Sequence, residues 1–384
     1  MMSENNKLEI KVTKKDFSQA LVFANSAVEK KNVIIELSYV KLVAKNGVLE
    51  IGVTDMDVYL NQEIGAEVIS EGQTTVSIST LSDIVRKIPD SEIKLIHEEN
   101  SNKLDIIGAN CKFELLTLPA SKFPLLEDLE SEVKLDIDRA DFARLIEYTI
   151  FSISTEETRY NLNGVYMHAK ENVFACVSTD GHRLSAADIK LGKKFNEFGV
   201  IVPRKTVSEL LKILLDFKNL QFDIQITLSS TKIKFQFANI ILISKLIDGT
   251  FPEYSSFIPK DNKNKLTINS KLLNDAIDRV AVVTVDKFRA VKLIIDDKSL
   301  TVNASGEAKG TAKEVINYST EDKNFCLYEG ENISIGFNPK YLSDVMSTLA
   351  EKQVEIYLDQ SQTPILIKTS ADSHDNFVVM PVKV

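Results

Sequence analysis

Three segments of the chain share one pattern, in which a short run of alternating apolar and polar residues precedes a helix-like stretch. They cover residues 8–28, 133–153 and 264–284. Phe17, Phe142 and Leu273 hold equivalent places in them, at nearly equal spacing along the chain. From each of them apolar residues recur at i+3, i+4 and i+7, except at Thr149. This spacing predicts one buried stripe on each helix.

A second pattern recurs in the same order. It covers residues 74–88, 198–214 and 333–349. Leu81, Val207 and Leu342 are equivalent and again nearly evenly spaced, and apolar residues follow each of them at the same three offsets. Two patterns that repeat in matching order at matching spacing predict a threefold internal repeat with two helices in each copy.

Alternating stretches between and after these helices predict antiparallel strand pairs. The first set is 40–55, 164–180 and 291–306, with turns at Lys-Asn-Gly 45–47, Lys-Glu-Asn 170–172 and Asp-Asp-Lys 296–298. The second set is 92–108, 222–237 and 354–368. Each repeat is therefore predicted to place two helices on antiparallel sheet, which is an α+β fold.

Two Phe-Pro dipeptides mark the ends of the first two repeats. They stand at 123–124 and 251–252, so their spacing matches that of the repeated helices. Together with the repeats they predict three domains, at 1–130, 131–261 and 262–384. Three chained sheets leave unpaired edges, and closing the array into a ring with helices on its inner wall would remove them.

The net charge argues against a nucleic-acid partner when it is taken alone. The chain has 46 Lys and Arg against 55 Asp and Glu, a formal charge of −9, whereas nucleic-acid binding normally needs a basic surface. Outside their apolar stripes, however, the predicted helices carry a modest excess of basic residues. This distribution fits loose phosphate contact without sequence preference, and it equally fits ordinary solvated helix faces.

Five segments resemble the signature segments of the bacterial sliding clamp family, the beta subunit of DNA polymerase III. They are TRYNLNGVY (158–166), STDGHRLS (178–185), VIVPRK (200–205), DGTFPEY (248–254) and VVMPVKV (378–384), in the family's order and at its spacing. With the repeats, the resemblance covers essentially the whole chain. It implies the DNA clamp fold and a non-catalytic processivity factor without cofactors, which closes head to tail as a homodimer around double-stranded DNA.

The resemblance also implies a pocket between the second and third domains that takes short peptides of partner proteins. Those partners are the clamp loader, the DNA polymerase III alpha subunit and other proteins with a clamp-binding motif. An apolar cleft with a few polar groups suits such a ligand. The matching residues are Arg159, Leu162, Thr179, Gly181, His182, Arg183, Leu184, Pro252, Val378, Val379, Met380, Pro381 and Val382.

Ser256 and Phe257 depart from the family, which often has an arginine and a small aliphatic residue there. Val382, before the basic Lys383, is a further position that bears on peptide preference. For DNA contact, the resemblance points to Lys31, Arg86, Tyr160, Asn161, Arg204 and Lys205. For the subunit interface, it points to Phe113 and Leu115 of the first domain and to Val282 and Val283 of the third.

Two other functions compete with this interpretation. Ser178, Asp180 and His182 supply the groups of a hydrolase, but they fall close together in the chain and no GxSxG segment is present. The four histidines are scattered and form no metal-binding spacing, and no phosphate-binding glycine loop occurs. A sheet-rich scaffold that binds peptides but never meets DNA shares every pattern above and stays open.

The expected location is the cytoplasm. The apolar runs are too short to cross a membrane, so no membrane partner is predicted. The first residues lack the basic start and apolar core of a signal peptide.

Overall fold

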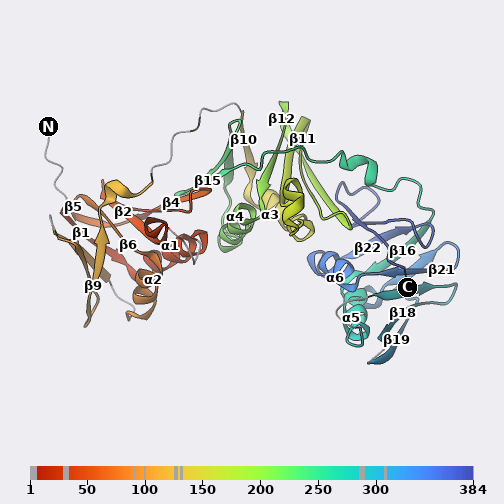
Figure 1. The fold of residues 1–384 in the computed structure, drawn as a ribbon. Coiled ribbons are helices and arrows are strands. Elements are labelled where there is room, and N and C mark those ends of the chain that lie inside the picture. The colour runs from red at the N-terminus through yellow and green to blue at the C-terminus, as the bar shows by residue number, and fades with distance from the viewer. Residues whose placement is uncertain are drawn as a thin grey trace. The chain divides into compact units, whose positions relative to one another are not determined.

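The computed structural model describes residues 7–28, 34–89, 92–98, 101–124, 129, 133–284, 290–306 and 309–383. They form two compact units, Met1–Phe142 with Lys205–Leu246, and Ala143–Arg204 with Ile247–Val384. Each unit places helices against antiparallel sheets (Figure 1), as the α+β prediction expected. Within the described residues, no helix is long and apolar enough to cross a membrane.

The described residues contain six α-helices, one at each segment whose apolar spacing predicted it. They are α1 (Lys14–Ala27), α2 (Ile78–Lys87), α3 (Arg139–Glu147), α4 (Arg204–Asp216), α5 (Ser270–Ala281) and α6 (Pro339–Thr348). The first residue of each predicted stripe is fully buried. In the first unit α1 packs on β3 (Val48–Thr54) and β4 (Val58–Gly65). In the second unit α5 packs on β17 (Val291–Ile295), β18 (Ser299–Gly306) and β19 (Gly310–Asn317).

Side-chain caps fix where most of these helices begin. Thr13 accepts a hydrogen bond from the N–H of Asp16, and Asn269 accepts one from the N–H of Leu272 (both 3.2 Å). Asp138 accepts two hydrogen bonds from backbone N–H groups in the first turn of α3. Such caps satisfy backbone donors that have no partner inside the helix. Thr149, the exception to the stripe pattern, lies beyond the end of α3 and donates its hydroxyl to the carbonyl of Leu145 (2.7 Å).

The first unit contains a 13-stranded sheet. Its order is β10 (Val133–Asp138), β13 (Asp223–Leu228), β14 (Lys232–Phe237), β15 (Ile240–Lys245), β4 (Val58–Gly65), β3 (Val48–Thr54), β2 (Tyr39–Lys45), β6 (Gly72–Ser77), β9 (Lys112–Leu118), β8 (Lys103–Ile107), β7 (Glu92–His97), β1 (Leu8–Thr13) and β5 (Glu67–Ser70). Strand β15 of the central repeat pairs with β4 of the first repeat, from Ile240 opposite Gln62 to Ser244 opposite Val58. Strand pairing therefore joins the two repeats edge to edge.

The second unit contains two sheets. The seven-stranded one runs β11 (Gly164–Thr179), β12 (Arg183–Pro203), β24 (Asn376–Val379), β23 (Ile365–Lys368), β22 (Gln353–Leu358), β16 (Asn264–Asn269) and β20 (Cys326–Glu329). The four-stranded one runs β19 (Gly310–Asn317), β18 (Ser299–Gly306), β17 (Val291–Ile295) and β21 (Ile333–Phe337). Strand β12 of the central repeat pairs with β24 of the third, a second edge-to-edge junction.

One predicted turn is wrong. The hairpins at Asn46-Gly47 and at 296–298 are present, and both turn residues of the first have positive φ. At 170–172, by contrast, β11 continues without a turn, and its pairing with β12 shifts register on either side of Glu171. Because β12 has 21 residues, it pairs with both halves of β11. The register shift forms a β-bulge in β11, in which Glu171 has φ +54°.

The two limits between the three predicted domains stay a prediction. The limit at 130/131 lies outside the described residues, and the limit at 261/262 falls between the short helix η5 (Tyr254–Phe257) and β16. The two compact units instead divide the central repeat, because β10 and β13–β15 belong to the first unit and β11 and β12 to the second. The two strand junctions explain this division physically.

Replacing Leu273 with alanine should lower the free energy of unfolding of the C-terminal repeat by about 2–5 kcal/mol, because the side chain is fully buried and its removal leaves a cavity. Urea unfolding followed by circular dichroism measures the change. Lys271→Ala, on the exposed side of the same helix, is the matched control and should change stability by less than about 0.5 kcal/mol. Equal effects of the two substitutions would contradict the predicted stripe.

Candidate functional site

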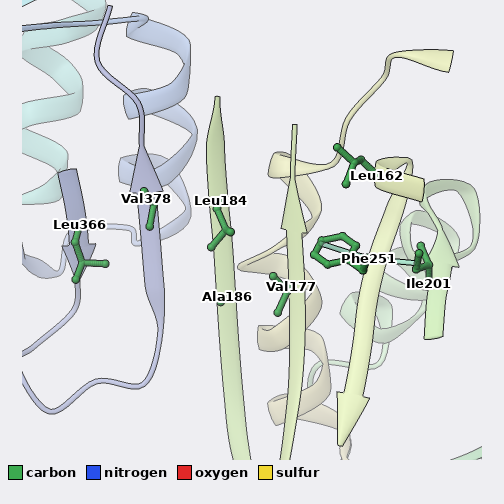
Figure 2. Packing of buried hydrophobic residues seen from close by; sticks show 8 residues of the cluster. All are labelled: Leu162, Val177, Leu184, Ala186, Ile201, Phe251, Leu366 and Val378. Atoms are coloured by element: carbon green, nitrogen blue, oxygen red, sulfur yellow. The ribbon is translucent and has the colours of Figure 1, made fainter. Parts of the chain in front are cut away.

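An apolar pocket with a volume of about 530 Å³ opens on the second unit. Beneath it lies the buried cluster of Leu162, Val177, Leu184, Ala186, Ile201, Phe251, Leu366 and Val378 (Figure 2). Leu162, Leu184 and Val378 belong to this cluster and also line the pocket. The floor of the pocket is therefore part of the hydrophobic core, and the packing of that core holds it rigidly.

The pairing of β12 with β24 builds this floor. Leu184 stands opposite Val378 in the register, although the two lie in different repeats, far apart in the sequence. Figure 2 shows them on adjacent strands. Beyond the last paired residues, the N–H of Met380 donates to the carbonyl of His182 (2.9 Å). This bond holds Met380 at the pocket, where its side chain is 40% exposed.

The turn between β11 and β12 forms one rim. Asp180 accepts hydrogen bonds from the N–H groups of His182 (2.9 Å) and Arg183 (3.0 Å), which fixes the turn. Gly181 has φ +87°, and a Cβ atom there would lie 2.6 Å from Nη1 of Arg159. Glycine is the residue that accepts this conformation and this close approach without strain.

Arg183 is a buried cation that is fully partnered. Its side chain is 7% exposed and forms ion pairs with Asp180 (3.1 Å) and Asp344 (2.5 Å). It also donates to the carbonyl of Phe151 and lies over the ring of Tyr341, 4.7 Å from the centroid. A buried charge is stable only when it is compensated in this way. Arg183 therefore fastens the turn to α6, which positions the rim.

The opposite wall comes from the segment after Phe251. His168 shares a hydrogen bond with the hydroxyl of Tyr254 (3.0 Å), and Tyr166 stacks on Phe251 with ring centroids 4.9 Å apart. Burial lowers the pKa of His168 and raises the pKa of Tyr254 to about 12. Both groups are consequently neutral at pH 7.

Of the residues that the sequence resemblance assigned to the pocket, eight line it together. They are Leu162, Thr179, Gly181, Arg183, Leu184, Pro252, Val378 and Met380. Arg159, His182 and Val379 adjoin the lining without forming it: His182 stacks on Tyr341, and Val379 is fully buried. Pro381 and Val382 line a separate neighbouring hollow.

The lining also contains residues that sequence analysis did not assign to it. They are Tyr254, Ile258, Pro259, Lys260, Asp261, Asn262, Asp359, Thr363 and Pro364. Tyr254 ends the DGTFPEY motif, and the lining residues up to Asn262 follow it directly. Their position in the sequence could therefore have assigned them to the pocket. Thr363 and Pro364 carry no such signal, because only the pairing of β22, β23 and β24 brings their loop to the pocket.

Family models match all three repeats of the chain. Models of the N-terminal, central and C-terminal domains of the DNA polymerase III beta subunit match residues 8–127, 136–253 and 255–383. The chain belongs to the beta sliding clamp family. Members of this family are non-catalytic processivity subunits of DNA polymerase III.

Individual sliding clamps match over nearly the whole chain. The beta sliding clamp of Rickettsia bellii is 52% identical over 379 residues, which is 98% of this chain and 100% of that protein. The beta sliding clamp of Escherichia coli K12 is 32% identical over 343 residues, 89% of this chain and 90% of that protein. The crystal structure of a sliding clamp from Bartonella birtlesii bound to griselimycin has a TM-score of 0.91 and 34% identity, covering 98% of this chain and 100% of that one.

Two candidate DNA-contacting cations of this clamp are already in ion pairs. Arg86, at the end of α2, pairs with Asp83 (2.8 Å), and Lys205 pairs with Asp55. Each of these cations would therefore meet a phosphate beside a carboxylate that partly balances its charge. Lys31 lies outside the described residues.

The remaining DNA candidates lie in the second unit. Tyr160 is 59% exposed on the short helix η4 (Glu157–Leu162). Its neighbour Asn161 donates from its side chain to the carbonyl of Thr250 (2.9 Å). Arg204, at the start of α4, donates its backbone N–H to the carbonyl of Asn163 (3.0 Å).

Two of the candidate interface residues lie beside an open strand edge. Phe113 and Leu115 are half-buried on β9. That strand pairs with β8 over residues 112–116 but with β6 only at Thr117 and Leu118, so one side of 112–116 has no strand partner among the described residues. In the second unit Val282 follows α5 and is 72% exposed, with Val283 next to it.

The alternative chemistries find no support in the geometry. Ser178 is fully buried and donates its hydroxyl to the carbonyl of Thr149, while Asp180 accepts bonds from the turn backbone. The groups of the alternative hydrolase site are therefore engaged elsewhere. In the part of the chain that the structure describes, no group of three or more His, Cys, Asp or Glu side chains could hold a metal ion.

Replacing Arg183 with leucine should destabilise the second unit by about 3–5 kcal/mol, because Asp180 and Asp344 would lose their buried partner. Arg159→Leu is the control, since that side chain is half exposed and its pair with Glu156 lies at the surface; it should cost less than about 1 kcal/mol. Urea unfolding of both variants makes the comparison. A mild effect of Arg183→Leu would show that the cation does not hold the turn.

Proposed function

We propose that two copies of this chain close head to tail into a ring around double-stranded DNA and tether replication and repair proteins through the apolar pocket. The pocket carries the proposal, because it combines an apolar floor with a fastened polar rim on a chain that belongs to a processivity family. Such a surface takes a few apolar side chains of an extended segment and orients them through polar groups.

Peptides are the ligand class that fits this pocket best. Met380 and Phe257, both partly exposed, stand at its edge and supply adaptable contact area. Phe257 and Ser256 replace the small aliphatic residue and the arginine that the family often has, so we expect a peptide preference that differs from that of the family. The Bartonella birtlesii relative bound to griselimycin supports the capacity of this fold to hold a compound.

The homodimer would form through the two open strand edges. Strand β9 exposes one edge beside Phe113 and Leu115, and β19 pairs only with β18 among the described strands. Because the two surfaces differ, contact between them is heterologous, and two copies close it into a ring that covers both of these edges.

DNA would be held by enclosure, with weak and sequence-independent contacts from Lys31, Arg86, Tyr160, Asn161, Arg204 and Lys205. The ion pairs of Arg86 and Lys205 and the net charge of −9 both favour weak contact over tight binding. We place the protein in the cytoplasm, where a clamp loader opens the ring and the DNA polymerase III alpha subunit and other motif-bearing proteins use the pocket.

Met380→Ala should weaken the binding of griselimycin about tenfold, because the ligand would lose roughly 1.4 kcal/mol of apolar contact at the edge of the pocket. Isothermal titration calorimetry with the purified chain provides the measurement. Leu215→Ala, which shortens an exposed side chain of the first unit, should bind as the unchanged protein does. Unaltered binding to Met380→Ala would place the ligand outside this pocket.

The enclosure proposal predicts retention on closed DNA and loss from open DNA. After loading by its clamp loader with ATP, the protein should remain on circular DNA through gel filtration and be released once that DNA is linearised. Leu115→Asp should yield monomers by light scattering and abolish retention, because a charge would enter an apolar interface.

Leu220→Asp is the matched control for that experiment, since Leu220 is an exposed leucine of the same unit. It should dimerise and stay on circular DNA. Equal retention on circular and linear DNA, or a stable monomer at high concentration, would instead favour a peptide-binding scaffold that does not enclose DNA.

A further inference from the structure

A row of four residues, two of them lysines, crosses the four-stranded sheet of the second unit. In the strand register, Gly336 of β21 stands opposite Lys292 of β17, Lys292 opposite Asn303 of β18, and Asn303 opposite Lys313 of β19. Residues that are opposite in register share a face, and neighbouring strands lie about 4.8 Å apart. The two lysines are therefore on one face, with backbones about 10 Å apart.

The end of the chain brings a third lysine to this face. The N–H of Val382 donates to the carbonyl of Gly336 (2.8 Å), so the segment after β24 runs along β21. Lys383 follows it. Two hollows of about 460 and 560 Å³ lie here, and Lys292 and Lys383 line both of them. Lys313 lines the second.

The lysine face (Lys292, Lys313 and Lys383) carries three positive side chains. In the part of the chain that the structure describes, no aspartate or glutamate lines either hollow. Among the described residues none of the three lysines has a carboxylate within 4.0 Å, whereas Lys265 and Lys271 of the same repeat do. In a chain with a net charge of −9, three unpaired cations on one face indicate a site for anionic groups.

The other lining groups suit a peptide. Ser334, Ser361 and Gln362 supply hydrogen-bond donors. Asn303 has its Oδ1 atom buried without a hydrogen-bond partner. A backbone N–H of a bound chain would supply that partner.

The first hollow is lined by residues next in sequence to those that line the apolar pocket. Met380 lines the pocket, and the next three residues line the hollow. Likewise Thr363 and Pro364 line the pocket, while Ser361 and Gln362 line the hollow. A peptide that leaves the pocket over the loop of residues 359–364 would therefore enter the lysine face within a few residues.

We propose that the lysine face is a second subsite, which binds acidic side chains of the same peptide whose apolar residues occupy the pocket. The inference rests on the proposed peptide-binding function and adds a determinant of which partners bind. Because exposed ion pairs are weak and screened by salt, two or three of them should raise affinity about three- to tenfold at low salt.

Fluorescein-labelled peptides with one Leu-Phe pair in a Gly-Ser background test the proposal by fluorescence polarisation, with griselimycin as the competitor. In each peptide, three glutamates or three glutamines are added on one side of the Leu-Phe pair, either the N-terminal or the C-terminal side. In about 50 mM salt a glutamate extension on one side should bind about three- to tenfold more tightly than the glutamine extension. In about 500 mM salt the difference should vanish.

Two double variants separate local contact from overall charge. K292Q/K383Q should abolish the gain from glutamate and leave the affinity for glutamine peptides unchanged. K298Q/K323Q removes the same charge from exposed lysines of the same repeat that line neither hollow, and it should keep the gain. In K292E/K383E the preference should reverse toward lysine-extended peptides.

The opposing outcomes are distinct. No gain from glutamate in the unchanged protein, or equal loss in the two glutamine variants, overturns the subsite while the pocket stands. If K292Q/K383Q keeps the gain but loses retention on circular DNA, the face contacts DNA and the inference is wrong. If none of the peptides binds, or if griselimycin displaces none of the bound peptides, the pocket proposal and the subsite fail together.

Discussion

Pairing between edge strands of successive repeats is the interaction on which the rest of this structure depends. Strand β15 pairs with β4, and β12 pairs with β24. Each junction satisfies backbone N–H and C=O groups that an isolated repeat would leave open. The division of the central repeat between two compact units follows from these junctions. The edges of β9 and β19 that stay open are the natural places for a second copy of the chain.

The candidate pocket is a consequence of the second junction. Pairing of β12 with β24 sets Leu184 beside Val378 and leads the chain onward to Met380. The turn before β12 is held by Arg183, whose buried charge is balanced by Asp180 and Asp344. Strand pairing, apolar packing and a compensated cation thus hold both the floor and the rim, so a ligand meets a surface that is already formed. The proposed lysine face lies directly beyond it.

Charge has two roles in the proposed function. A net charge of −9 and the carboxylate partners of Arg86 and Lys205 weaken contact with phosphates, which suits a protein that must move along DNA. At the lysine face, unpaired cations would instead select among partners. Enclosure would supply lasting attachment to DNA, while local charge would supply discrimination.

The sequence by itself determined the helices, most strand pairs and the family, because apolar periodicity and short motifs are local properties of the chain. It also led to eight of the pocket-lining residues through motif resemblance. Only the tertiary structure decided the rest. The bulge at Glu171 depends on the length of the paired strand, and Thr363 and Pro364 reach the pocket through strand pairing. The partner of Lys205 is Asp55, which belongs to a different repeat. Long-range contacts of this kind follow from how strands register and side chains pack, which no local pattern encodes.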